Sequence, residues 1–246
     1  MEDKESITIR KAVINQAINY IFEHIDEDIM VEDVAKYCSY SKYHLMRMFK
    51  EDMDEALYQF IKRVRLERSA WRLKVEKERS ITEIGETYGY SSSNFATAFK
   101  KHLDISPADY RRSSEQMVED SSFSHGMTLD DLDDAGSKIT VEYLAPFTVL
   151  YERKKGNYHN LSDEWCDFIE KYKYFSTEDT LYIECTIDDP SITDENCCMY
   201  ELCQTVMPDD QKLKEHPEVL LHDFEGGKYA VYHFKGIPQL LFMVYQ

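Results

Sequence analysis

The sequence contains one internal repeat, and its two copies lie fifty residues apart. The segment VEDVAKYCSYSKYHLMRMFK (31–50) aligns without a gap with ITEIGETYGYSSSNFATAFK (81–100). In each copy, apolar residues at helical spacing flank a short polar turn that ends in Ser41 or Ser91. Serine is a favoured residue just before a helix begins, because its hydroxyl accepts a bond from a free backbone N–H. The repeat therefore predicts two helix–turn–helix units.

The segments around the repeats also have helical periodicity. Apolar residues recur at helical spacing over 7–25, and residues 54–74 between the copies read as one long helix. About 20 residues at ~1.5 Å each span ~30 Å, close to one DNA turn of roughly 34 Å. One chain would therefore place two recognition helices in successive segments of the major groove. The long helix also carries basic residues suited to phosphate contacts: Lys62, Arg63, Arg65, Arg68 and Arg72.

The outer face of the second helix of such a unit is the part that enters the major groove. In the first unit the outward residues are Lys42, Tyr43, His44, Met46, Arg47 and Lys50. In the second they are Ser92, Ser93, Asn94, Ala96, Thr97 and Lys100. Arg47 can bond guanine as a fork and Asn94 can bond adenine, whereas Ala96 and Thr97 suit thymine methyl groups. The smaller side chains predict looser specificity for the second unit. An ordinary helical hairpin gives similar spacing, but two copies in register joined by a basic helix favour DNA binding.

The net charge of −18 is concentrated in the second half of the chain. Residues 1–112 hold 19 Lys and Arg against 20 Asp and Glu, whereas residues 113–246 hold 10 against 27. Strong acidity opposes nucleic-acid binding only where it lies near the binding surface. The distribution is therefore compatible with DNA binding by the first half.

The composition and periodicity of the sequence change after residue 112. Residues 113–137 are rich in Ser, Asp and Gly and predict an acidic interdomain linker with loose tethering. Residues 138–246 alternate in the manner of strands and include one amphipathic helix near Trp165, which predicts an α+β domain. The first domain is expected to be all-α and to cover residues 1–112.

Cysteine usage and the chain ends predict a cytoplasmic protein. The six cysteines favour reduced thiols, and buried strand thiols are favoured over a metal site because Cys197, Cys198 and Cys203 lack zinc-ligand spacing. No secretory signal and no apolar run of membrane-spanning length are seen in the sequence. No cofactor or metal is expected.

The first half resembles the AraC/XylS family of bacterial transcription regulators. The resemblance rests on the two repeats, on IKRVRLERSAWRL between them and on the ending ISPADYRR, and it covers residues 10–112. It implies seven helices, recognition helices at Ser41–Lys50 and Ser92–Lys101, binding to double-stranded promoter DNA and contact with RNA polymerase, most simply as an activator. Ser41 and Lys101 thereby join the expected DNA contacts. Ser39 and Asp104 stand where relatives usually have turn glycines, and the second unit looks one residue shorter than in many relatives.

The second half resembles the GyrI-like effector-binding domain, through VLYERKKGNYHNLSDEW, IDDPSITDENCCMYELC and GGKYAVYHFKG. In that family two strand–helix–strand–strand halves enclose an aromatic site for small molecules, often hydrophobic cations. The residues expected to serve here are Tyr151, Tyr158, Trp165, Tyr182, Glu184, Tyr232 and Phe234. The same aromatics also suit a core. The chain ends within the last expected helix, which predicts an incomplete second half.

Two further interpretations stay open. The acidic half resembles gyrase-inhibitor relatives and would then cover a partner protein. Alternatively, some relatives hydrolyse electrophiles with Trp and Glu, for which Trp165 and Glu184 would be the candidates. The sequence contains no P-loop, HExxH, GxSxG or GxGxxG motif, and we expect a regulator rather than an enzyme.

Overall fold

The computed structural model describes residues 4–113, 139–157 and 161–233. The linker predicted at 113–137 lies outside these ranges apart from its first residue, and so do Tyr158 and Phe234. Among the described residues, no helix is both long and apolar enough to cross a bilayer.

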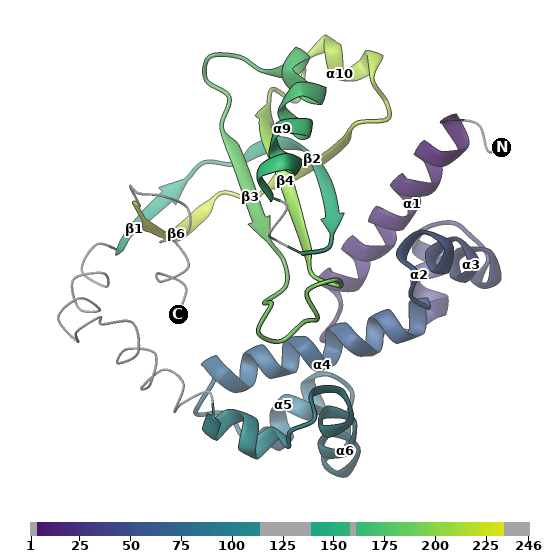
Figure 1. Ribbon diagram of the computed structural model, residues 1–246, viewed down its shortest axis with the longest axis vertical. Helices are drawn as coiled ribbons and strands as arrows, with labels where there is room; N and C mark the ends of the chain where they lie inside the picture. Colours follow the sequence, from purple (N-terminus) through teal and green to yellow (C-terminus); the bar gives the residue numbers. More distant parts are fainter. Residues whose placement is uncertain (1–3, 114–138, 158–160, 234–246) are drawn as a thin grey trace.

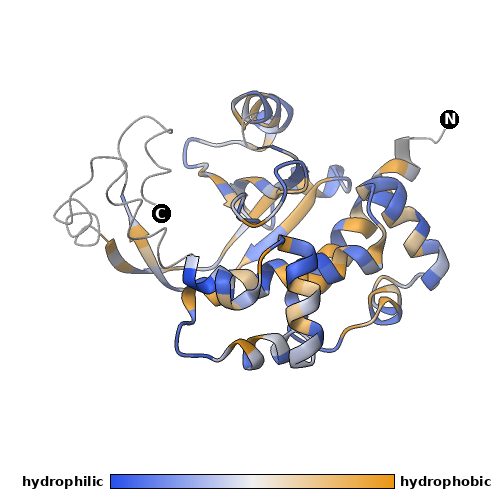
Figure 2. Ribbon diagram, turned by 60° about the horizontal axis from the view of Figure 1, so that its bottom comes forward, coloured by the Kyte–Doolittle hydropathy of each residue, from blue (hydrophilic) through white to orange (hydrophobic). Residues whose placement is uncertain are grey.

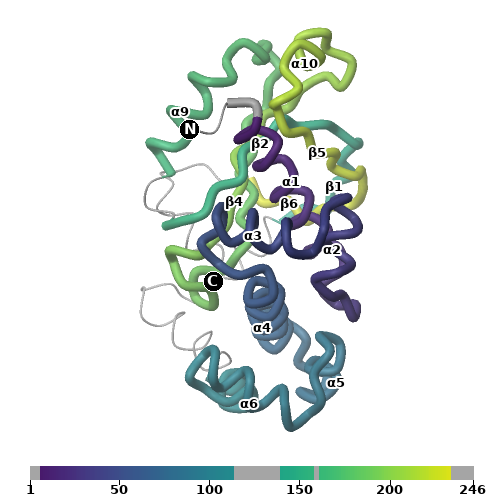
Figure 3. Tube along the Cα trace, turned by 90° about the vertical axis from the view of Figure 1, so that its right-hand side faces the viewer, coloured from purple at the N-terminus to yellow at the C-terminus, as the bar shows by residue number. Residues whose placement is uncertain are grey.

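The first half is helical, as predicted. Its elements are α1 (Lys4–Glu23), α2 (Val31–Tyr37), α3 (Lys42–Met53), α4 (Leu57–Val75), α5 (Ile81–Thr87) and α6 (Ser92–Leu103). Residues 107–113 are helical as well. Figure 1 shows α2 and α3 beside the start of α4, with α5 and α6 beneath it, and Figure 3 shows the same order from the side. The two helix–turn–helix units are thus attached to one central helix.

Local signals in the sequence determine where these helices begin. Ser41 caps α3, since its Oγ accepts a hydrogen bond from the His44 N–H at 3.4 Å. Ser80 and Glu83 form a reciprocal capping box at the start of α5. The central helix begins three residues later than predicted, because Asp54 ends α3 in the left-handed conformation, with φ 53°.

The apolar residues of both units face a common core. Leu45, Met48 and Phe49 of α3 are buried, as are Phe95 and Phe99 of α6. They belong to one buried cluster with residues of α1 and α4, including Ile18 and Phe60. Figure 2 shows alternating hydrophilic and hydrophobic bands along the helices, as expected when one face of each is buried.

In both units the first helix packs against the second through one pair of residues, but the sizes of the two residues differ between the units. Ala35 and Leu45 in the first unit correspond to Gly85 and Phe95 in the second. The chain bends alike in both, because Tyr40 N–H donates to Ala35 O at 2.9 Å and Tyr90 N–H to Gly85 O at 3.0 Å. A Cβ on Gly85 would lie 2.8 Å from Cγ of Phe95. The larger Phe95 therefore requires glycine opposite it.

We expect Gly85→Ala to destabilise the protein by roughly 1–2 kcal/mol, because the added methyl group overpacks the core. Phe95→Leu in the same chain should recover part of this loss, since it recreates the Ala35–Leu45 pair. Urea unfolding of the wild type, both single variants and the double variant measures the coupling. Strictly additive effects would contradict this packing account.

Three residues other than glycine adopt the left-handed conformation among those described: Ser39 (φ 60°), Asp54 (φ 53°) and Asp104 (φ 59°). Ser39 and Asp104 are the positions where relatives are expected to have glycine. Gly89, which occupies the position equivalent to Ser39 in the second unit, has φ 77°. The turn geometry is thus kept, and the side chain at Ser39 adds strain.

We expect Ser39→Gly to stabilise the protein by about 0.5–1 kcal/mol, because relief of this strain exceeds the entropy gained by the unfolded chain. Ser91→Gly is the matched control, since Ser91 has φ −69° and gains nothing from glycine. Thermal or urea unfolding decides the matter, and equal effects of the two substitutions would contradict the assignment of strain to Ser39.

The second half contains antiparallel sheets and helices, as predicted. Its elements are β1 (Ile139–Leu144), β2 (Phe147–Lys155), α9 (Leu161–Tyr172), the 3₁₀ helix η2 (Lys173–Phe175), β3 (Tyr182–Thr186), β4 (Met199–Val206), α10 (Gln211–Glu215), β5 (Leu220–Phe224) and β6 (Gly227–Tyr232). One sheet has the order β3-β4-β2-β5, and β1 pairs with β6 in a separate two-stranded sheet.

The four-stranded sheet has two different faces. Strand residues alternate between them, with Glu152 paired to Leu202 and Tyr151 paired to Cys203. Leu150 and Leu202 pack with α9 residues such as Phe168 on one face, which we call the α9 face. Val149, Tyr151 and Cys203 lie on the other, which we call the α1 face because residues of α1 contact it.

The two halves are in direct contact rather than loosely tethered, in contrast to what the linker composition predicted. The sheet lies above α4 and beside α1 in Figure 1. Ile192 and Met199, which lie in and next to the loop 187–198, are buried in the same apolar cluster as the helices. The apolar core therefore runs from one half of the chain into the other.

Candidate nucleic-acid interface and ligand residues

The outer face of α3 is polar and open to solvent. Tyr43 is 84% exposed, and the side chain of Arg47 is 70% exposed, with only a 4.0 Å ion pair to Glu51. Ser41, His44 and Lys50 are exposed, and Met46 is half-buried against the core. Arg47 and Tyr43 are thus the long side chains of α3 with the most freedom to meet DNA.

Two lysines at the ends of this face are held by acidic neighbours. Lys42 Nζ donates to Glu32 Oε1 at 2.6 Å, which raises the pKa of Lys42. Lys50 Nζ donates to the backbone oxygen of Asp54 at 2.7 Å. Lys50 Nζ also lies 3.3 Å from Asp54 Oδ1. A phosphate would therefore have to compete with the carboxyl groups of Glu32 and Asp54 for these two lysines.

The outer face of α6 is also exposed and carries short side chains. Ser92, Ser93, Asn94, Ala96, Thr97, Lys100 and Lys101 are all exposed. Thr97 Oγ1 donates to Ser93 O at 3.0 Å, which turns its hydroxyl toward the helix. Its methyl group is left to contact a base. This face of α6 can therefore approach a groove closely. Its positive charges, on Lys100 and Lys101, lie toward the C-terminal end of the helix.

Of the five basic residues proposed on α4, Arg63 and Arg65 do not suit phosphate contacts equally. Arg63 is 9% exposed and donates to Glu55 and Glu67, so the sequence-based expectation for Arg63 does not fit its position. The sequence did not reveal that Arg63 is buried, because an arginine on the buried side of a helix, paired with carboxylates, looks the same in sequence as one on the exposed side. Arg65 is half-buried, and its Nη2 donates to Glu27 O at 2.8 Å and Ile29 O at 3.2 Å.

The structure brings three of the proposed ligand residues together on the α9 face. Trp165 Nε1 donates to Glu184 Oε2 at 3.1 Å, and the rings of Trp165 and Tyr182 meet edge to face, with centroids 6.2 Å apart. Tyr182 and Glu184 are exposed and Trp165 is half-buried. Aromatic faces beside a carboxylate suit an organic cation.

The other described candidates lie elsewhere. Tyr151 is 3% exposed on the α1 face, where burial raises the pKa of its phenol. Tyr232 belongs to the separate β1–β6 sheet, paired with Ile139. Tyr151 and Tyr232 therefore do not join Trp165, Tyr182 and Glu184 in one cluster.

A second carboxylate of the α9 face is already neutralised. Burial alone would raise the pKa of Glu152, but hydrogen bonds from Lys171 and Lys154 outweigh it and lower the pKa to about 2. Lys154 also pairs with Glu164 at 2.8 Å. Glu184 is thus the carboxylate of this face that is better placed to balance a cationic ligand.

Arg153 of β2 is the centre of the contact between the two halves. Its Nη1 donates to Asn15 Oδ1 at 3.2 Å and its Nη2 to Asn19 Oδ1 at 2.6 Å, both on α1. Its Nε donates to Glu201 Oε1 at 3.0 Å, and the side chains of this ion pair are 8% and 10% exposed. The guanidinium also lies 5.9 Å from the Phe22 ring centroid. One buried cation therefore links two strands to α1.

Two further lysines link the halves. Lys155 Nζ donates to Met53 O, the last residue of α3, at 2.7 Å. Lys74 of α4 donates to Asp189 Oδ2 at 3.0 Å and to Ser191 Oγ at 2.8 Å in the loop 187–198. The first helix–turn–helix unit and the central helix thus both contact the sheet domain.

Asp188 and Asp189 of this loop experience opposite environments. Burial raises the pKa of Asp188 to about 6, and Glu67 adds to the rise, whereas the Met199 N–H and the cations of Arg63 and Arg68 oppose it. Burial would also raise the pKa of Asp189, but bonds from Ser191 and Lys74 outweigh it and lower the pKa.

We expect Asp188→Asn to stabilise the protein by roughly 1–3 kcal/mol at pH 7. A raised pKa means that the folded protein holds the proton more tightly. The penalty from Asp188 is therefore absent below about pH 4 and complete above about pH 6. Asp189→Asn should do the opposite, destabilising at neutral pH with an effect that fades in acid. Urea unfolding at several pH values tests the pair, and parallel pH profiles would contradict these environments.

The strand alternation in the sequence contains a signal for the buried Arg153–Glu201 pair that the search for motifs did not detect. Arg153 has the same strand phase as the buried Val149 and Tyr151, and Glu201 has the same phase as Cys203. Opposite charges at inward positions of neighbouring strands indicate a buried ion pair. The partners on α1 carry no such signal, because Asn15 and Asn19 are ordinary polar residues in the sequence.

Comparison with known proteins finds a match for each half of the chain. A family model described as "Helix-turn-helix domain" matches residues 34–113, and one described as "GyrI-like small molecule binding domain" matches residues 137–239. Regulatory protein SoxS of Escherichia coli K12 is 37% identical over 100 residues, which cover 40% of this chain and 92% of that protein.

Transcriptional regulator Rob of Salmonella typhimurium LT2 is 38% identical over 104 residues, which cover 42% of this chain and 36% of Rob. Among solved structures, the C-terminal domain of AraT, a response regulator from Geobacillus stearothermophilus, is 34% identical. It covers 41% of this chain and 84% of that one, with a TM-score of 0.39. The match to SoxS spans nearly all of that relative. The chain therefore belongs to the AraC/XylS family of transcription regulators and carries a GyrI-like domain as its second half.

Proposed function

We propose that this regulator binds promoter DNA as a monomer, with α3 and α6 in successive segments of the major groove. The observation that carries the proposal is the attachment of two exposed recognition faces to one helix. The 19 residues of α4 span about 28 Å, close to one DNA turn. On α3, Arg47 and Tyr43 are free to contact base edges and phosphates, and on α6 the short side chains allow close approach.

Selection of binding sites from randomised duplex DNA with the full chain tests this proposal. We expect an asymmetric site with two preferred blocks about one turn apart. Affinity for the selected site should fall as salt rises, because each phosphate contact releases counterions. A palindromic site, or enrichment of one block alone, would contradict two-headed binding by a single chain.

We also propose that the GyrI-like domain binds a hydrophobic cation at Trp165, Tyr182 and Glu184. The support is the pairing of an indole and a phenol ring with a carboxylate on one face of the sheet. Binding would bias the regulator through β2, β4 and Arg153, which join this domain to α1, and RNA polymerase contact would belong to the helical half. An aromatic quaternary ammonium compound is a suitable probe. Glu184→Gln should weaken its binding, whereas Glu178→Gln, on the exposed surface, should not.

The same Trp165–Glu184 hydrogen bond is the observation that favours a second candidate, hydrolysis of an electrophile. Turnover of an activated ester by the full chain, lost in both Trp165→Phe and Glu184→Gln, would support it. If any turnover is unchanged in these variants, these residues have no part in it.

A further inference from the structure

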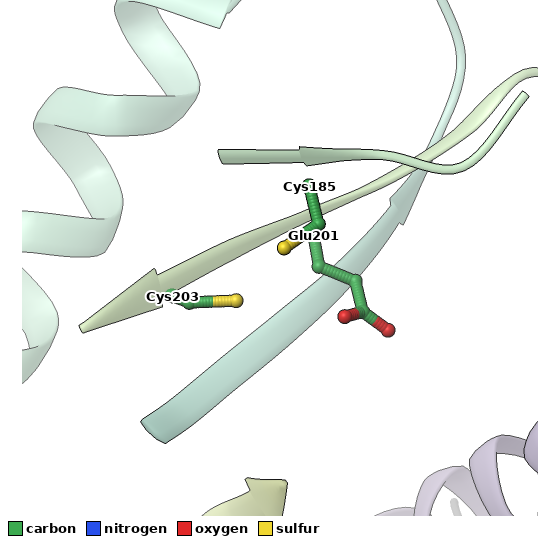
Figure 4. A group of neighbouring side chains, drawn as sticks. All are labelled: Cys185, Glu201 and Cys203. Atoms are coloured by element: carbon green, nitrogen blue, oxygen red, sulfur yellow. The ribbon is translucent and has the colours of Figure 1, made fainter. Parts of the chain in front are cut away.

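Three side chains with metal-binding atoms meet on the α1 face of the sheet, outside the proposed ligand cluster. They are Cys185 of β3 and Glu201 and Cys203 of β4, and one ligand atom of each lies within 4.8 Å of the others. Figure 4 shows the two sulfur atoms close together and the Glu201 carboxylate on the same side of the sheet. Cys185 is paired with Glu201, and Cys203 is one diagonal step away.

We propose that Cys185, Cys203 and Glu201 bind a thiophilic divalent cation, of which Zn²⁺ is the natural example. Zinc takes thiolate sulfur at about 2.3 Å and carboxylate oxygen at about 2.0–2.2 Å, which in a tetrahedral site puts ligand atoms about 3.3–3.8 Å apart. Since the ligand atoms lie within 4.8 Å of one another, the cluster needs to close by at most about 1–1.5 Å. Water would occupy the fourth position.

Electrostatic balance favours a cation at this place. The two sulfur atoms and a carboxylate oxygen of Glu201 all lie within 4.8 Å of one another, so one ion could contact all three. Arg153 already neutralises Glu201. When the cation enters, each thiol loses its proton and the two thiolates neutralise the metal charge, so the buried site stays uncharged overall. Both protons are released to solvent, and affinity should therefore rise with pH.

The neighbours of the cluster also suit a metal site. Arg153 donates to Oε1 of Glu201 through both Nε and Nη2, so Oε2 keeps lone pairs for a cation. A hydrogen-bonded ligand carboxylate is what metal sites usually have, because the outer partner fixes its orientation. Spacing along the chain could not reveal this site, since Cys185 and Cys203 are far apart in sequence and the clustered Cys197 and Cys198 lie elsewhere.

Titration of the reduced full chain with Cd²⁺ tests the site, because Cd²⁺–thiolate bonds absorb in the ultraviolet. We expect one tight Cd²⁺ per chain and release of protons on binding. Cys185→Ser should weaken binding at least tenfold and remove about half of the thiolate absorption. Cys166→Ser is the matched control, since Cys166 is exposed on α9, and should leave both unchanged. Equal absorption in Cys185→Ser and wild type would overturn the proposal.

Alkylation of the wild-type chain gives a second test that does not depend on a variant folding. Cys185 is half-buried and reachable, whereas Cys203 is fully buried. Zn²⁺ should slow iodoacetamide modification of Cys185 at least tenfold and leave Cys166 unaffected. Equal modification rates of Cys185 with and without Zn²⁺ would overturn the proposal. The inference concerns the sheet domain alone and stands apart from the proposed DNA binding.

Discussion

Arg153→Ala is expected to destabilise the full chain by roughly 3–5 kcal/mol, because it leaves the carboxylate of Glu201 buried without its cation. It also removes the donors that hold Asn15 and Asn19 of α1. Urea unfolding should show a large loss and should change from one transition to two, since the halves no longer unfold together. Arg153→Lys should retain only part of the stability that Arg153→Ala loses, because one ammonium cannot reach the same set of acceptors.

Two control variants separate this effect from simple loss of charge. Arg112→Ala removes an exposed arginine that pairs with the exposed Asp109 and should change stability by less than about 0.5 kcal/mol. Glu201→Gln in the Arg153→Ala chain should restore part of the stability, because it removes the unpaired carboxylate. If the double variant is no more stable than Arg153→Ala, the unpaired carboxylate of Glu201 is not the source of the lost stability.

Arg47→Ala should weaken binding to the selected DNA site by roughly 1–3 kcal/mol, about fivefold to 150-fold, and relax the base preference in one block. The expectation follows from the 70% exposure of the side chain and its loose contact with Glu51. Because the ion pair of Arg47 with Glu51 is long and exposed, its loss should change stability by less than about 0.5 kcal/mol. Fluorescence anisotropy with selected and random duplexes measures the difference.

Lys77→Ala is the control for this prediction, since it removes an exposed positive charge in the loop between α4 and α5. Lys77→Ala should weaken binding to the selected and to the random duplex by the same small amount. A loss for Arg47→Ala that is equal on random DNA would show that Arg47 contacts phosphate alone, and would contradict its role in reading bases.

Much of the helical half follows from the sequence, because short-range signals decide it. Helical periodicity and Ser41 placed α3 correctly, and the repeat then placed α6. The Ser39 turn was also predictable, because the equivalent residue in the second unit is Gly89. What local signals could not give was the direction of each charged side chain. Arg63 looked like a phosphate contact but turns inward to Glu55 and Glu67.

The sequence predicted that the second half is an α+β domain, but it did not predict which side chains of that domain meet. Alternation identified β2, β3 and β4, yet the register between these strands determines that Tyr151 faces α1 whereas Glu184 faces α9. Register depends on long-range pairing, which a single sequence specifies weakly. For the same reason the Cys185–Glu201–Cys203 cluster and the Arg153 contact with α1 appear only in three dimensions.

We propose that one chain reads two successive groove segments through α3 and α6. The most direct measurement compares the affinity of the full chain for the selected site with its affinity for the same site carrying about half a helical turn of extra DNA between the blocks. The insertion places the second block on the opposite side of the duplex. We predict a loss of at least tenfold, to the level of one unit binding alone. Unchanged affinity would contradict simultaneous binding by the two helices.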